Sequence, residues 1–169
     1  APAPGDRPRR APIGLGLPHA RDGKLRMLAV LASERTPLAP DLTPPPERFA
    51  DLLLQGLADH GLAERAQILS FDWRTLQAVQ RLRPGTPTVY LTAQLPGLDN
   101  LQARSAQPSP WTAGFEHRAH GSTPRMIAAA GGSHWSSFWR ELDTAQVREA
   151  QALGLQVLAW TVNRPDDMR

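Results

Sequence analysis

The feature that most constrains the fold of this sequence is a regular alternation of helical and strand patterns after residue 46. Segments with helical periodicity alternate with short runs of continuous apolar residues, a pattern typical of parallel strands covered by helices. Four runs are expected to be strands: residues 66–71, 86–92, 133–136 and 155–162. A fifth apolar run, residues 25–31, is a strand or a helical turn, and periodicity does not decide which. The sequence therefore predicts an α/β fold with about four to five parallel strands.

Two architectures fit this order of elements, an open doubly wound sheet and part of a (β/α)8 barrel. No glycine-rich phosphate-binding motif of the G-x-G-x-x-G or G-x-x-x-x-G-K-[ST] type follows a predicted strand, which weakens the nucleotide-binding, doubly wound interpretation. A complete (β/α)8 barrel needs about 250 residues. This chain has 169 residues and stops in the predicted first turn of a helix that Pro165 opens. We therefore expect a partial barrel that is incomplete at both ends.

The predicted helices have recognisable starts and apolar faces. Asp72 and Thr144 are expected to cap two of them, and Gly61 and Gly154 to end two of them. The residues predicted to face inward are apolar and recur at helical spacing: Phe49, Leu52, Leu53 and Leu57; Leu76, Val79 and Leu82; Val147, Ala150 and Leu153.

The N-terminal segment differs in composition from the rest of the chain. Residues 1–45 contain seven Lys/Arg and four Asp/Glu, whereas residues 46–169 contain twelve of each. The neutral remainder argues against a nucleic-acid-binding protein. Proline-rich residues 1–35 are predicted to be a disordered or non-native tail, and residues 36–169 a partial barrel domain. The chain has no cysteine for disulfides or nucleophilic catalysis, and no apolar run near the ~18 residues that a transmembrane helix needs.

Two segments of the chain resemble the glycerophosphodiester phosphodiesterase family, whose members are (β/α)8 barrels. Residues 69–92 read LSFDWRTLQAVQRLRPGTPTVYLT and are similar to the segment around the family's Ser-Phe-Asp signature. Residues 154–168 read GLQVLAWTVNRPDDM and contain its late Trp-Thr-Val-Asn motif. The resemblance extends from about Leu38 to Arg169. Both motifs occur in the family's order, each at the end of a predicted strand, so the chain resembles the middle and late part of such a barrel.

The resemblance implies a phosphoric diester hydrolase that converts a glycerophosphodiester to sn-glycerol 3-phosphate and an alcohol. In the family two histidines act as general acid and base, and Glu and Asp residues hold a divalent cation, Mg²⁺ or Ca²⁺. The family's early His-Arg-Gly strand, Glu-x-Asp pair and second His are absent here. Glu34 stands where the family's Ile-Glu-x-Lys motif has its Glu, although Thr36 occupies the Lys position. Glu34 is therefore the candidate metal ligand and the candidate catalytic residue, no other residue is assigned as catalytic, and the chain is predicted to be truncated and inactive.

Aromatic and small polar residues cluster at the predicted strands, and in a (β/α)8 barrel the carboxyl ends of the strands form the site. The clusters are Ser70, Phe71 and Asp72; Thr92 and Gln94; His134, Trp135 and Ser136; and Trp160, Thr161 and Asn163. Rings that cover the carbons of glycerol, beside groups that bind its hydroxyls, would suit this substrate. Trp160, the Trp of the family motif, and Phe71 are the candidate substrate-binding residues. Alternatively, Phe71 and Trp160 only fill the barrel end, while Ser70 and Asp72 cap the next helix.

Other polar residues have structural explanations. His117 and His120 form an H-x-x-H pair without a third ligand at a telling spacing, and a zinc site needs three or four, so they are expected at the surface. Glu141 and Asp143 flank a predicted helix start and are expected to interact with its dipole.

Two functions therefore stay open: a truncated glycerophosphodiester phosphodiesterase, or a non-catalytic α/β module that binds a polyol phosphate or a protein partner. The unpaired edges of a partial barrel predict self-association of the isolated chain. The compartment stays open between cytoplasm and periplasm, because the family has cytoplasmic and exported members. If the first ~35 residues come from a shifted reading frame, another frame of the coding DNA should encode the missing Ile-Glu-x-Lys strand.

Overall fold

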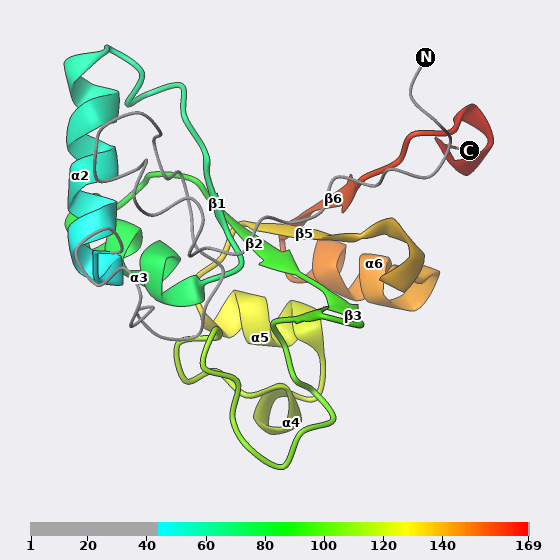
Figure 1. Ribbon diagram of the computed structural model, residues 1–169. Helices are drawn as coiled ribbons and strands as arrows, with labels where there is room; N and C mark the ends of the chain where they lie inside the picture. The colour runs from blue at the N-terminus through cyan, green and yellow to red at the C-terminus, as the bar shows by residue number, and fades with distance from the viewer. Residues whose placement is uncertain (1–43, 169) are drawn as a thin grey trace, which may run out of the picture. The chain divides into compact units, whose positions relative to one another are not determined.

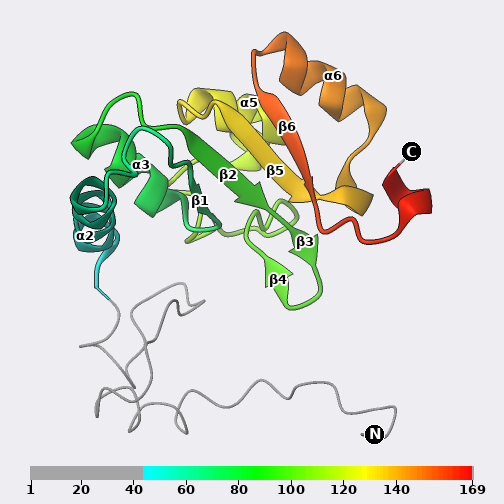
Figure 2. The same cartoon turned by 90° about the horizontal axis from the view of Figure 1, so that it is seen from above.

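The computed structural model describes residues 44–168, in which four parallel strands form one sheet in the order β1-β2-β5-β6. The strands are β1 (Ile68–Ser70), β2 (Thr88–Thr92), β5 (His134–Phe138) and β6 (Gln156–Trp160). Each lies beside the next in chain order, as Figures 1 and 2 show. The sheet confirms the predicted α/β fold with parallel strands, and within the described residues the barrel is not closed.

Helices connect the strands in the manner of successive (β/α) units. The main helices are α2 (Pro46–Asp59) before β1, α3 (Trp73–Leu82) between β1 and β2, α5 (Thr123–Ala129) before β5, and α6 (Thr144–Ala152) between β5 and β6. The long segment between β2 and α5 holds a hairpin of β3 (Gln94–Leu95) and β4 (Leu98–Asp99), and the short helix α4 (His117–His120). Single 3₁₀ turns follow β5 and β6, at Trp139–Glu141 (η1) and Pro165–Met168 (η2).

Some predictions fall outside the part of the chain that the structure describes. The predicted tail of residues 1–35, the apolar run 25–31 and Glu34 all precede residue 44. Among residues 44–168, no helix has the length and apolar character needed to cross a membrane.

The core lies between one face of the sheet and helices α3 and α5. Tyr90 and Trp135 from the sheet, Trp73 and Leu76 from α3, and Met126 from α5 are each at most 2% exposed. The rings of Trp73 and Tyr90 meet edge to face, with centroids 4.8 Å apart. Burial stabilises the fold by about 1.5–3 kcal/mol for an apolar side chain such as Leu or Met. This layer fixes α3 and α5 against the sheet and so fixes the loops that follow the strands.

A polar contact holds Tyr90 in place within this core. Its Oη donates to the carbonyl oxygen of Ala130 at 2.9 Å, and Gln77 Nε2 donates to that Oη at 2.8 Å. Burial raises the pKa of Tyr90, with the hydrogen bond to Gln77 opposing the shift. The phenol therefore stays protonated at neutral pH and joins β2, α3 and the turn after α5.

The predicted N-cap residue is observed at one of two helices and lies one residue away from the observed N-cap at the other. Asp72 caps α3 as predicted, because its Oδ1 accepts from the Arg74 N–H at 3.0 Å. The prediction that Thr144 caps α6 is wrong: Asp143 is the N-cap and accepts from the Gln146 N–H at 2.8 Å. The Gln146 side chain accepts in return from the Asp143 N–H, which completes a capping box and selects Asp143 over Thr144.

The predicted inward face of α2 is wrong in part. Leu53 and Leu57 pack against the core, but Phe49 and Leu52 are 41% and 44% exposed, while Ala50 is fully buried. The apolar arc of α2 is broader than the surface that α3 covers, and helical spacing alone does not reveal which side of the arc is covered.

Two further residues predicted to face inward are exposed. Leu82 is 53% exposed and Leu153 is 43% exposed, whereas Leu76, Val79 and Ala150 are fully buried as predicted. Leu82 is the last residue of α3 and Leu153 follows the last residue of α6. Neither has a further helical turn beyond it to shield it from solvent.

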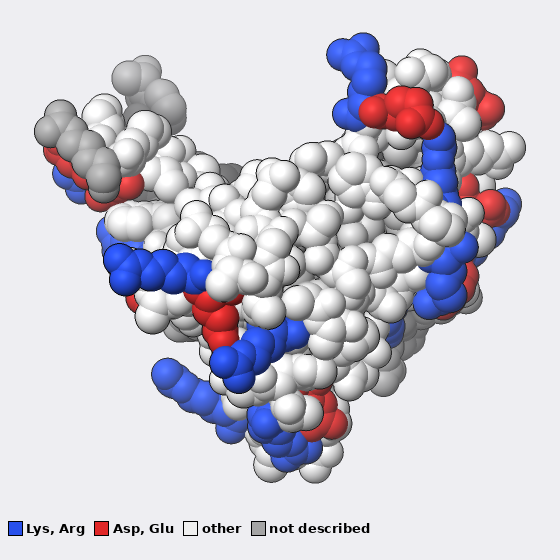
Figure 3. All heavy atoms as spheres, turned by 180° about the vertical axis from the view of Figure 1, so that it is seen from behind, with Lys and Arg blue, Asp and Glu red and all other residues white. Residues whose placement is uncertain are grey.

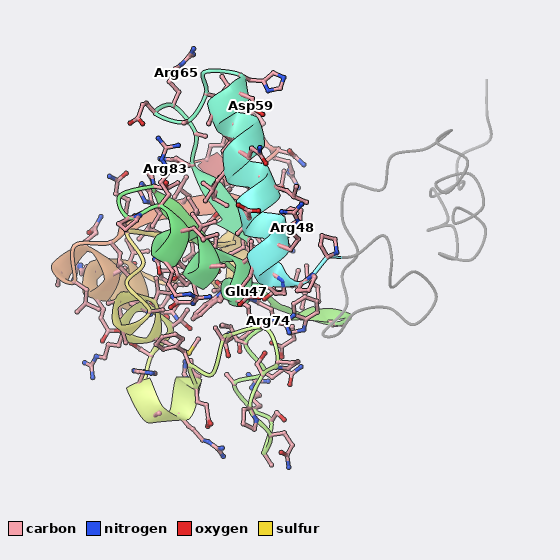
Figure 4. All side chains as sticks on the ribbon, turned by 90° about the vertical axis from the view of Figure 1, so that its left-hand side faces the viewer. Glu47, Arg48, Asp59, Arg65, Arg74 and Arg83 are labelled. Carbon is pink, nitrogen blue, oxygen red and sulfur yellow. The ribbon has the colours of Figure 1, made fainter. Side chains whose placement is uncertain are left out.

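Charged side chains lie at the surface in mixed pairs. Arg81 contacts Glu47 of α2 at 3.3 Å, and Arg83 contacts Glu64 at 2.5 Å; Glu47 and Arg83 are labelled in Figure 4. On the face in Figure 3, basic and acidic side chains lie around the margin and the broad middle carries neither. Exposed pairs of this kind contribute about 0–1 kcal/mol each, so they do not decide the fold.

Candidate functional site

Three aromatic rings meet at the carboxyl edge of the sheet and define what we call the aromatic triad: Phe71, Phe138 and Trp160. Phe71 follows β1, and Phe138 and Trp160 are the last residues of β5 and β6, paired in register. The Trp160 ring lies 5.7 Å from Phe71, edge to face, and 5.6 Å from Phe138, measured between centroids. Sequence reasoning selected Phe71 and Trp160 but missed Phe138, because it ended the third strand at residue 136.

Trp160 presents a polar group without an acceptor. Its Nε1 is buried and has no hydrogen-bond partner within residues 44–168. Buried N–H groups are nearly always paired in folded proteins, and an unpaired one costs about 1–3 kcal/mol. The indole N–H is thus a donor that a ligand oxygen at this edge can satisfy.

Asn100 joins the ends of β1 and β2 beneath this edge. Asn100 is only 2% exposed, and its Nδ2 donates to the carbonyl oxygens of Phe71 at 3.1 Å and Leu91 at 3.0 Å. Its Oδ1 accepts from the Ala93 N–H at 2.9 Å. Asn100 therefore sets the backbone position of Phe71. Sequence reasoning missed it, because residues 93–121 have no periodicity that marks a buried position.

Ser70 and Asp72 are engaged in local backbone contacts. Ser70 Oγ accepts from the Asp72 N–H at 3.0 Å, and Asp72 Oδ2 forms an ion pair with Arg74 at 2.7 Å. These contacts match the capping alternative.

The prediction that His134, Trp135 and Ser136 lie together at the carboxyl edge of the sheet is wrong. His134 begins β5, at the opposite edge, and its Nδ1 lies 2.8 Å from Ser133 Oγ. Trp135 faces the helices and donates from Nε1 to Thr92 Oγ1 at 2.8 Å. The predicted strand, residues 133–136, begins one residue and ends two residues earlier than β5. His134, Trp135 and Ser136 were therefore expected too close to the carboxyl end of the strand.

Glu141 anchors the β3–β4 hairpin. The prediction that it interacts with the dipole of α6 is wrong. The Gln94 N–H donates to Glu141 Oε1 at 2.9 Å and Oε2 at 3.1 Å, across 47 positions in the sequence. Burial raises the pKa of Glu141, the hydrogen bond from Gln94 opposes this, and the charge of Asp99 adds to the rise. The carboxylate thus fixes the hairpin that follows β2 at the carboxyl edge.

The raised pKa of Glu141 predicts a small pH dependence of stability. A carboxyl group whose pKa is higher in the folded than in the unfolded state stabilises fully below the unfolded pKa, and this contribution is lost as pH rises through the folded pKa. Glu141→Gln should remove this pH-dependent loss of folding stability. We expect the loss to be about 0.5 kcal/mol, because the carboxyl group is partly solvated. Urea unfolding between pH 4 and pH 7 measures it, with the exposed Asp166→Asn as control. An unchanged pH slope in Glu141→Gln would contradict the assignment.

The remaining histidines of residues 44–168 do not assemble a metal site. His117 lines a shallow pocket of the β2–α5 segment with Glu116 and Arg118, and His120 lies beside Phe115 with ring centroids 6.0 Å apart. No group of three or more His, Asp or Glu residues that could hold a metal ion occurs between residues 44 and 168.

Consecutive (β/α) units with an open sheet, and a site at the carboxyl ends of the strands, define a protein of the (β/α)-barrel class. The chain belongs to the glycerophosphoryl diester phosphodiesterase family, whose sequence profile matches residues 36–169. Among curated proteins, none matches this chain.

Solved structures share this fold. A protein of Silicibacter pomeroyi DSS-3, assigned as a glycerophosphoryl diester phosphodiesterase, is 31% identical over 73% of this chain, with a TM-score of 0.57. A glycerophosphodiester phosphodiesterase of Parabacteroides distasonis ATCC 8503 shares the fold at 21% identity over 75% of this chain, with a TM-score of 0.52. The matched region spans 36% and 44% of those two structures.

Proposed function

We propose that this chain carries the middle and late part of a glycerophosphodiester phosphodiesterase, which hydrolyses a glycerophosphodiester to sn-glycerol 3-phosphate and an alcohol. The observation that carries the proposal is the aromatic triad with the unpaired Trp160 N–H at the carboxyl edge. Phe71 and Trp160 bind the carbons of glycerol, and Trp160 Nε1 donates to an oxygen of the substrate. Asn100 holds Phe71 in position for this contact.

The divalent cation that the family implies, Mg²⁺ or Ca²⁺, does not fit the described residues. Such hard cations need several oxygen ligands, and no group of three candidate ligands lies within residues 44–168. Glu34 remains a proposed ligand outside the described residues. We therefore derive no catalytic step through the metal, and we propose that the chain alone binds substrate without turning it over.

Inactivity of the isolated chain is a direct prediction. With Mg²⁺ or Ca²⁺ present, it should hydrolyse glycerophosphocholine no faster than buffer, because general acid–base groups typically contribute about 10²–10⁴-fold and the family's histidines are absent. Choline release measures this. Metal-dependent turnover that disappears in Glu34→Gln would contradict the prediction and identify Glu34 as a ligand.

Binding tests the proposed substrate class separately from turnover. Titration calorimetry should show saturable binding of glycerophosphocholine to the chain, and Trp160→Phe should weaken this binding about tenfold through loss of the indole donor. Trp111→Phe, in the segment between β2 and α5, is the matched control. Absence of binding by the wild-type chain would refute the role of the triad.

The alternative is a non-catalytic α/β module that binds a polyol phosphate or a protein partner, which the missing metal-ligand group within residues 44–168 favours. The coding DNA separates the two functions. An Ile-Glu-x-Lys strand in another reading frame would favour the truncated enzyme, and its absence from every frame would favour the module. In either case the open sheet favours self-association of the chain.

A further inference from the structure

The hairpin of β3 and β4 stands at the carboxyl edge, between the strands that lead to two rings of the aromatic triad. In the sheet β2 lies between β1 and β5, and the hairpin follows β2 directly. Phe71 follows β1 and Phe138 ends β5. Figure 2 shows the hairpin beyond the carboxyl end of β2. In (β/α)8 barrels the loops at this edge build the active site, so the hairpin borders the place where the triad would bind substrate.

Hydrogen bonds hold the hairpin from both sides. On the side of β1, Asn100 at the base of the hairpin donates from Nδ2 to the carbonyl oxygen of Phe71 at 3.1 Å. On the side of β5, the Gln94 N–H donates to Glu141 Oε1 at 2.9 Å and Oε2 at 3.1 Å. Glu141 lies in the η1 turn that follows Phe138. The hairpin is thus fixed to the two elements that carry Phe71 and Phe138.

Two leucines of the hairpin, Leu95 and Leu98, lie on the triad's side of the sheet. By the strand register, Leu91 shares its face of β2 with Phe138 of β5. The chain stays extended from β2 into β3, because the N–H and the carbonyl of Ala93 both bond across the base of the hairpin. Side chains alternate along an extended chain, so Leu95 continues the face of Leu91. Leu98 is its partner across the hairpin, and both leucines are partly exposed.

We propose that Leu95 and Leu98 contact the alcohol half of the substrate, and that Glu141 is a positioning residue that holds the hairpin in place for this contact. The inference rests on the proposed function, in which the triad binds the carbons of glycerol. The phosphate joins glycerol to the alcohol, so the alcohol lies one phosphate group away from the triad. The hairpin borders the triad there and offers the alcohol an apolar surface. Residues 95 and 98 therefore determine which alcohol is accepted, without affecting how glycerol is bound.

Two ligands that differ in the presence of the alcohol test this contact: glycerol 3-phosphate and glycerophosphocholine. In titration calorimetry, Leu95→Ala should weaken binding of glycerophosphocholine about fivefold and leave binding of glycerol 3-phosphate unchanged. Leu82→Ala, at the exposed end of α3, is the matched control and should change neither. Equal weakening of both ligands, or of neither, would overturn this proposal while the proposed function stands. A wild-type chain that binds neither ligand would overturn both.

Hydrogen exchange tests the positioning role of Glu141 without any ligand. Glu141→Ala removes the acceptor of the Gln94 N–H, so exchange of this amide should become about tenfold faster, whereas exchange of the buried Tyr90 amide should not change. The same variant should weaken binding of glycerophosphocholine and not of glycerol 3-phosphate. Glu149→Ala, which removes a carboxylate from α6, is the control and should alter neither readout. Unchanged exchange at Gln94, or faster exchange at Tyr90 as well, would overturn the positioning role.

Discussion

Gly132→Ala is expected to lower the free energy of unfolding by about 3 kcal/mol, because the position has no room for a side chain. A Cβ on Gly132 would lie 2.6 Å from Ile127 Cγ2, and 2.8 and 2.9 Å from Cδ2 and Cε2 of Tyr90. Both neighbours are fully buried. The Tyr90 ring is also held by its hydrogen bond to Ala130, so it has little freedom to move aside.

Gly56→Ala is the matched control for this substitution. Gly56 lies inside α2, and apart from its chain neighbours and the backbone of its own helix, no heavy atom lies within 4 Å of its added Cβ. Alanine in a helix interior is favoured over glycine by about 1 kcal/mol, so this variant should be more stable than the wild type. Urea unfolding at one fixed protein concentration compares the two variants. Equal stability of both would show that Gly132 is not closely packed.

Local sequence signals predicted the elements whose boundaries depend on neighbouring residues. The strands at residues 66–71 and 86–92 contain β1 and β2, and Asp72 caps α3, because an apolar run and a capping side chain act within a few residues. Gly131, which lies two residues beyond the end of α5 at Ala129 and has a φ of 73°, belongs to the same class of local signal. The close approach at Gly132 does not, since it depends on Tyr90 from another strand.

The candidate site was predictable only where a motif marked it. Trp160 ends β6 and Phe71 directly follows β1, and their ring contact agrees with convergence at the carboxyl edge. Their role as substrate-binding residues stays a prediction. Glu141 and Asn100 act through partners that are distant in sequence and that no local pattern reveals. Contacts of this kind are set by tertiary packing, which is why a helix-dipole role for Glu141 was a reasonable but wrong expectation.

Asn100→Asp is expected to have the largest effect on the carboxyl edge, with a loss of about 3–5 kcal/mol at pH 7. The substitution keeps the shape of the side chain and leaves an acceptor for the Ala93 N–H. It removes the two N–H donors, so an ionised carboxylate would face the carbonyl oxygens of Phe71 and Leu91 in a buried position. Phe71 would then lose the contact that fixes it beside Trp160.

The pH dependence of Asn100→Asp separates this mechanism from a general packing defect. Burial should hold the pKa of the new carboxyl above its unfolded value of about 3.9, so the folded state binds the extra proton. The protonated group donates one hydrogen bond, and the variant should therefore be least impaired below about pH 4 and lose stability as pH rises through the folded pKa. Urea unfolding between pH 3 and pH 8 measures this, with the exposed Asn163→Asp as the matched control. A stability deficit of the same size at every pH would assign Asn100 to packing alone and remove its hydrogen bonds from the account of how Phe71 is positioned.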